Sequence, residues 1–142
     1  MQHLRIDISQ DLEGEPVVFA CFDLRQDEIE ASAHAIAASA TERFRMASVS
    51  ADEVLELREL TALADELAEL ARVTSTVVLS PARLSAYRDA IAHFVETRDE
   101  ADWMREEDAE SVALLRAMLP PLEQLCAEAV RAALAPTAPR AC

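Results

Sequence analysis

The sequence contains no lysine, no asparagine and only one glycine, Gly14. Because glycine and asparagine supply most of the positive-φ residues of tight turns, a sheet built from successive short hairpins is disfavoured. A single glycine also excludes the glycine-rich loops that hold nucleotide phosphates against a helix. Alanine, leucine, glutamate and arginine make up much of the remainder, and they are strong helix formers. The composition therefore predicts a mostly helical protein.

Positive charge is also scarce. Thirteen arginines face 27 acidic residues, which gives a formal net charge of -14 over 142 residues. This balance opposes binding to the phosphates of nucleic acids and to anionic membrane surfaces. No apolar run has the length needed to span a bilayer. The charge favours a basic protein partner or a cation.

Cysteine occurs three times, as Cys21, Cys126 and Cys142. An odd number of cysteines at wide spacings, with no signal peptide before them, does not predict a disulfide framework. We therefore expect a reduced, cytoplasmic protein, and the exclusive use of arginine is typical of a GC-rich bacterial genome. Cys21 and Cys126 fall on apolar faces and are expected to be inert, whereas Cys142 is expected to be exposed.

Three segments have the apolar patterns of strands. Residues 3–9 alternate apolar and polar side chains, which predicts a strand with one wet face. The continuous apolar run 17–22 predicts a strand buried on both faces, joined to the first by a loose loop around Gly14. Residues 74–79 are rich in β-branched side chains and predict a third strand.

Helical periodicity begins near residue 26, where Asp23 and Gln26 are candidate capping residues, and continues to Phe44 on an alanine-rich apolar stripe. The next two helices have clearer start signals, Ser50 before an apolar face that extends to residue 73, and Ser80 followed by a proline before residues 81–95.

Two more helical segments are predicted towards the C-terminus. The first extends to the pair Pro120–Pro121, which is expected to end or kink it. The second extends from about residue 121 to residue 134.

Together these elements predict a predominantly helical α+β fold. An N-terminal β-hairpin and one further strand form a small sheet packed against four or five α-helices. A helical bundle with an N-terminal hairpin is the alternative. Residues 1–134 are predicted to form a single globular domain and residues 135–142 a disordered C-terminal tail.

Two carboxylate–histidine pairs have the spacing of metal ligands on a helix, Glu30 with His34 and Asp89 with His93. Side chains four residues apart share a helical face, so two such helices could surround one ion. However, each histidine lies off its apolar stripe, and the inward glutamates of di-metal bundles are lacking. Solvated ion pairs are the favoured interpretation, and we predict neither a metal nor another cofactor.

The only tryptophan lies in an acidic segment, residues 96–110. An aromatic anchor inside a charged rim is the layout of a protein-recognition hot spot. The residues of this candidate protein-binding site are Trp103, Met104, Asp99, Glu100, Asp102, Glu106, Glu107 and Asp108. The competing interpretation is that Trp103 closes the core between two helices while the acids are solvated, which is the commoner role of a lone tryptophan.

No linear motif of nucleophilic or metal-dependent catalysis occurs, so a binding role is favoured over an enzymatic one. We expect a small acidic protein-binding module that engages a basic protein partner, such as an inhibitor, an immunity-type protein or a chaperone-like adaptor. The alternative is a ligand- or metal-binding domain, with or without enzymatic activity, that has a pocket between sheet and helices. A homodimer is compatible with both.

Overall fold

The structure is a computed structural model that describes residues 1–45, 50–70, 72–99 and 106–134. Its elements are, in chain order, β1 (Gln2–Gln10), β2 (Pro16–Asp23), α1 (Gln26–Arg45), α2 (Ala51–Leu70), β3 (Thr76–Leu79), α3 (Pro81–Asp99) and α4 (Glu106–Leu134). The described residues therefore confirm the predominantly helical α+β fold, with four helices and a small antiparallel sheet. None of these helices is both long and apolar enough to cross a membrane.

The sheet has the strand order β1-β2-β3, and β2 in its centre is antiparallel to both neighbours. One side of β2 carries Ala20 and Phe22, which belong to the main core with residues of all four helices. On its other side, Val17 and Phe19 are only half-buried. The prediction that residues 17–22 are buried on both faces is therefore wrong for these two side chains, because helices pack on one side of the sheet.

The β1–β2 connection is a compact turn, not the loose loop expected from the sequence. The Asp11 carboxylate accepts hydrogen bonds from the backbone N–H groups of Glu13 and Glu15, each at 2.9 Å. Gly14 has a φ of 81°, a conformation that residues with a Cβ rarely adopt. The single glycine of the chain thus lies where the backbone needs it.

Asp23 joins all three strands instead of capping a helix. At the end of β2, its carboxylate accepts a hydrogen bond from the Thr76 hydroxyl of β3 at 2.7 Å. Its other oxygen lies 2.7 Å from Nδ1 of His3, which occupies an irregularity in β1 with a φ of 54°. The predicted capping pair of Asp23 with Gln26 is therefore wrong, since Asp23 has partners within the sheet.

These contacts predict an acid-sensitive sheet. The hydrogen bond from Thr76, followed by that from His3, holds the pKa of Asp23 below its ordinary value of 3.8. A carboxyl group whose pKa is lower in the folded than in the unfolded protein stabilises the fold above its unfolded pKa. That contribution is lost as the pH falls through the folded pKa, so the affected range lies below about pH 4.

We therefore expect the melting temperature of Asp23→Asn to fall less between pH 7 and pH 3 than that of the wild type. Thermal unfolding followed by circular dichroism at both pH values measures this difference. Glu123→Gln, at an exposed position of α4, serves as the control and should keep the wild-type difference. Equal falls in wild type and Asp23→Asn would show that the Asp23 contacts do not couple stability to pH.

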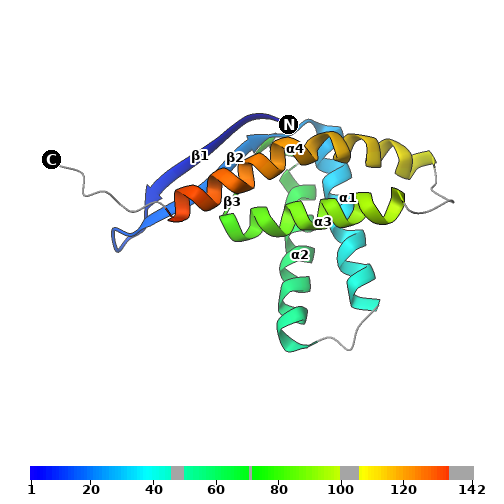
Figure 1. Ribbon diagram of the computed structural model, residues 1–142, viewed down its shortest axis with the longest axis horizontal. Helices are drawn as coiled ribbons and strands as arrows, with labels where there is room; N and C mark the ends of the chain where they lie inside the picture. Colours follow the sequence, from blue (N-terminus) through cyan, green and yellow to red (C-terminus); the bar gives the residue numbers. More distant parts are fainter. Residues whose placement is uncertain (46–49, 71, 100–105, 135–142) are drawn as a thin grey trace.

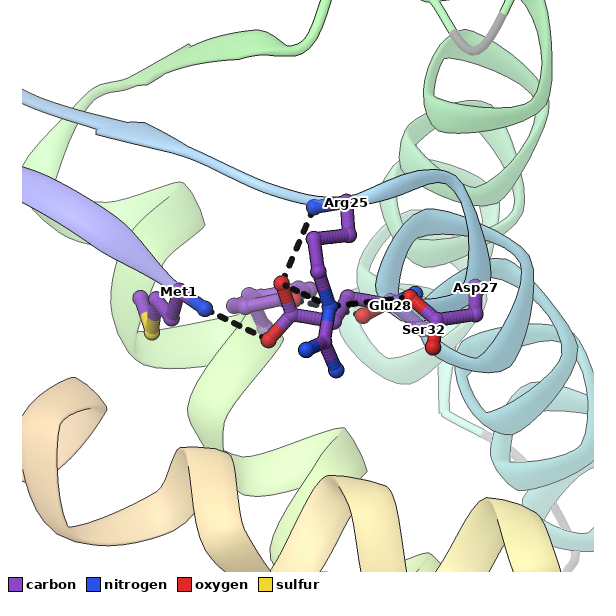
Figure 2. A network of polar contacts seen from close by, with 6 residues as sticks. Met1, Arg25, Asp27, Glu28 and Ser32 are labelled. Carbon is purple, nitrogen blue, oxygen red and sulfur yellow. Dashed lines mark hydrogen bonds and ion pairs between the residues drawn. The ribbon is translucent and has the colours of Figure 1, made fainter.

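Glu28 caps α1 in place of the expected pair. Among the described residues it is the only charged one that is buried, with 3% of its surface exposed. One carboxylate oxygen accepts the Arg25 backbone N–H at 2.9 Å, and the other accepts from the α-amino group of Met1 at 2.5 Å. Figure 2 shows the carboxylate between these two donors. The capping glutamate is thus also the contact that joins α1 to the start of β1.

The start signals of α2 and α3 are confirmed. The Ser50 hydroxyl accepts the backbone N–H of Glu53 at 3.3 Å, and the Ser80 hydroxyl accepts that of Arg83 at 3.3 Å. Each helix begins at the next residue, as expected for a serine N-cap.

Helix α4 continues through Pro120 and Pro121, so the two C-terminal helices expected from the sequence are one. Its axis changes direction along its length in Figure 1, as expected if the proline pair kinks the helix and does not end it. Met118 and Leu122 flank the proline pair and are both buried in the core. Packing on both sides of the prolines therefore maintains the helix across them.

The α1–α2 pair crosses α3 and extends away from the sheet (Figure 1). Near the crossing, α1 and α3 approach closely through buried serines: Ser32 shares a 2.6 Å hydrogen bond with Tyr87, and Ser39 donates to the Ala90 carbonyl. Phe44, close to the far end of α1, is 60% exposed although the stripe predicted it inward. The pair extends beyond the elements that could have covered this side chain.

Candidate functional site

A groove of about 660 Å³ lies between α2 and α3, with α1 contributing to its lining. Its apolar side chains come from α2 and α3 and include Leu60, Leu63, Ala86 and Ala90. Leu55 of α2 also lines it and is 59% exposed. A hydrophobic surface of this kind favours the apolar side chains of a ligand or partner.

The groove is bordered by arginine–glutamate ion pairs that link neighbouring helices. Arg83 of α3 contacts Glu66 of α2 through two hydrogen bonds, at 2.6 and 3.1 Å. Ten residues earlier on α2, Glu56 pairs with Arg43 of α1 at 3.2 Å. The hydrogen bond from Arg83 lowers the pKa of Glu66, so this pair is charged at neutral pH.

A third polar cluster lies between α1 and α3. Glu42 accepts a 2.6 Å hydrogen bond from Arg98, and its other oxygen lies 3.5 Å from Nε2 of His93. The Arg98 guanidinium is 4.3 Å from the centre of the Phe94 ring, a cation–π contact. Since His93 also lines the groove, this cluster fixes one of its polar edges.

The predicted metal-ligand pairs are not brought together at one site. Asp89 and His93 line the groove, but Asp89 pairs with Arg88 and His93 faces Glu42. Glu30 and His34 line a separate, smaller pocket formed by α1 and α4. Over the parts of the chain that the structure describes, no three His, Cys, Asp or Glu side chains converge as a metal site would require.

The chain matches no family model, no curated protein and no solved structure. Its function is therefore inferred from the groove and the charges around it.

Four of the eight residues of the predicted site around the tryptophan lie outside the described residues. They are Glu100, Asp102, Trp103 and Met104. Asp99 ends α3, and three further acids of the site begin α4, namely Glu106, Glu107 and Asp108, but the structure describes only their backbone. The anchor at Trp103 stays a prediction.

Two cysteines are described, and both are buried. The Cys21 thiol donates to Asp7 at 3.3 Å, and burial followed by this bond raises its pKa. Burial likewise raises the pKa of Cys126. A raised pKa disfavours the thiolate, so neither side chain is an activated nucleophile.

The groove was not predicted from the sequence, although one signal was present. Leu55 lies outside the buried leucine stripe of α2 that includes Leu57, Leu60 and Leu67. An extra leucine beside a core stripe is often a scattered surface residue, so it does not identify a groove by itself. The alternative function placed its pocket between sheet and helices, whereas this groove lies among three helices.

Proposed function

We propose that this chain is a protein-binding module whose groove between α2 and α3 holds the apolar side chains of a basic partner segment. The observation that carries the proposal is the apolar lining beside the exposed Leu55, with fixed ion pairs around it. This arrangement resembles an interface core with a polar rim. Burying Leu55 against a partner would remove apolar surface from water.

Charge supports a basic partner. Helix α2, which carries seven acidic residues and one arginine, contributes Glu56 and Glu59 to the wall of the groove, and the lining as a whole has three acids and two arginines, so it is net negative. Glu59 and Glu66 are near Arg83, and Glu53 and Glu69, elsewhere on α2 and outside the groove lining, have no ion pair in the described structure. A segment with lysines or arginines beside its apolar residues would be attracted to this wall, more strongly at low ionic strength.

The test uses a photo-crosslinking amino acid in place of Leu55, with the same substitution at Leu134 as the control. Leu134 is 78% exposed near the end of α4 and does not line the groove. In cells of the source organism, we expect position 55 to capture a discrete basic protein that position 134 does not capture. Identical products from both positions would contradict the proposal.

The captured protein then allows a quantitative comparison. We expect Leu55→Ala to weaken its binding about ten-fold, as loss of an interface anchor does, and Leu134→Ala to leave it unchanged. Raising the salt to about 0.5 M, where the Debye length is below ~5 Å, should weaken binding further. Trp103→Ala tests whether the predicted anchor contributes to the same interface. Binding that responds to neither salt nor Leu55→Ala would exclude the groove as the docking site.

The groove also supports a second candidate function, the binding of a small apolar molecule. Its volume of about 660 Å³ is within the range of small-molecule pockets, and His93 at its edge offers one polar contact. In that case a small molecule co-purifying with the protein would be detected by native mass spectrometry and would be lost in Ala86→Trp, which fills the groove. A protein partner would leave the purified chain without such a mass.

A further inference from the structure

The opposite side of α2 carries a second groove, of about 640 Å³, between α1 and α2. The α1 side chains that line it include Thr41, Phe44 and Arg45, and the α2 side chains include Arg58, Thr61, Ala62 and Asp65. Phe44, which the fold leaves 60% exposed, is its largest apolar side chain. Phe44 does not line the groove between α2 and α3, so a partner bound there would leave this aromatic side chain exposed.

We infer that a second copy of this chain covers this groove, with the two α2 helices packed antiparallel about a two-fold axis between Thr61 and Ala62. In that arrangement, residues of the two copies face each other when their numbers are symmetric about this point. Arg58 then faces Asp65 of the second copy, and the two-fold axis repeats the contact. The face is thus complementary in charge to itself.

Neither Arg58 nor Asp65 has a charged partner among the described residues. Over the described residues, no hydrogen bond or ion pair involves Arg58 or Asp65, and both are exposed. They are seven residues apart on one helix, which corresponds to about 10 Å along the axis. At that separation Arg58 and Asp65 cannot reach each other. Because only the small residues Thr61 and Ala62 lie between them on this face, each charge can pair with the opposite charge of a second, antiparallel copy.

The polar groups between these charges can be buried at little cost. The Thr61 hydroxyl donates to the Leu57 carbonyl at 2.9 Å, and the Thr41 hydroxyl donates to the Ala37 carbonyl at 2.9 Å. Because each donor is satisfied within its own helix, covering it leaves no unpaired hydrogen-bond donor. Ala62, between the charges, allows close approach of the second helix.

The local charge also permits two acidic chains to meet here. Arg45 and Arg58 outnumber Asp65 in the groove lining, whereas acids outnumber arginines around the groove between α2 and α3. Like-charge repulsion, which a net charge of -14 imposes elsewhere, is therefore reduced on this face. Because the two grooves lie on opposite sides of α2, dimerisation leaves the proposed partner site open.

Sedimentation equilibrium of the full chain tests the inference by charge exchange. We expect a wild-type dimer, and we expect R58D and D65R each to weaken dimerisation at least about ten-fold, because each substitution places like charges together twice. The double variant R58D/D65R exchanges the signs and should recover most of the wild-type affinity. A wild type that stays monomeric up to about 0.1 mM, or a double variant as weak as the singles, would overturn the inference.

Disulfide formation between two single variants tests the register. In a C142S background, a mixture of R58C and D65C should form a mixed disulfide, while R58C alone should not cross-link, since residue 58 of one copy does not face residue 58 of the other. The buried Cys21 and Cys126 are common to all samples. Cross-linking of R58C alone that equals the mixture would contradict the antiparallel register.

Discussion

Replacing Glu28 with alanine is expected to lower the free energy of unfolding by about 3 kcal/mol. The substitution removes the acceptor of the Arg25 backbone N–H and of the Met1 amino group, and the Glu28 carboxylate is almost fully buried. A buried donor that loses its partner keeps the cost of desolvation without the interaction that offset it. Urea unfolding at pH 7 measures the change.

Glu30→Ala is the matched control, since Glu30 lies two residues further on the same helix and is exposed. Its carboxylate accepts one exposed hydrogen bond, from the Gln26 side chain at 3.1 Å, so we expect a loss below about 0.5 kcal/mol. Glu28→Gln keeps an acceptor for the Arg25 N–H but removes the charge, and should give an intermediate loss. Equal stability of the Glu28 and Glu30 variants would show that the buried contacts contribute no more than a surface acid.

Two leucines of α2 are expected to respond very differently to the same substitution. Leu67 is 1% exposed and belongs to the core, so Leu67→Ala should lower the free energy of unfolding by about 3 kcal/mol through lost burial and a cavity. Leu55 is 59% exposed in the groove, and Leu55→Ala should change the free energy of unfolding by less than about 0.5 kcal/mol. Urea unfolding of both variants at one protein concentration makes the comparison.

This contrast bears on the proposed function. If Leu55→Ala weakens partner binding while the fold keeps its stability, the lost binding cannot be attributed to unfolding. A loss of stability comparable with that of Leu67→Ala would instead make Leu55 a core residue, and the groove would lose its exposed apolar contact.

The elements predicted best are those whose signals lie within a few residues. Ser50 and Ser80 mark helix starts because an N-cap hydroxyl accepts a hydrogen bond from a backbone N–H of the first turn, a contact that needs no other part of the chain. The strands were found from period-two alternation and β-branched residues, which are also local. The cap of α1 was assigned wrongly because Asp23 has partners on two other strands.

The features that the sequence did not predict depend on contacts between segments that are distant in the chain. The proline pair does not end α4, because Met118 and Leu122 pack into the core on both sides of it. The stripe of α1 placed Phe44 inward, but periodicity shows only which side of a helix is apolar and not how far its neighbour extends.

The sequence by itself determined the fold class, the acidity and the absence of linear catalytic motifs, because composition and short-range periodicity encode them. Only the tertiary structure decided which side chains line grooves. Leu55 and Ala86 are 31 positions apart in the sequence and lie on different helices, yet they line one groove. The proposed pairing of Arg58 with Asp65 between two copies likewise depends on the fold, which leaves both side chains exposed on one side of α2. Such surfaces arise from the way helices cross, which depends on packing across the whole chain and not on any local pattern.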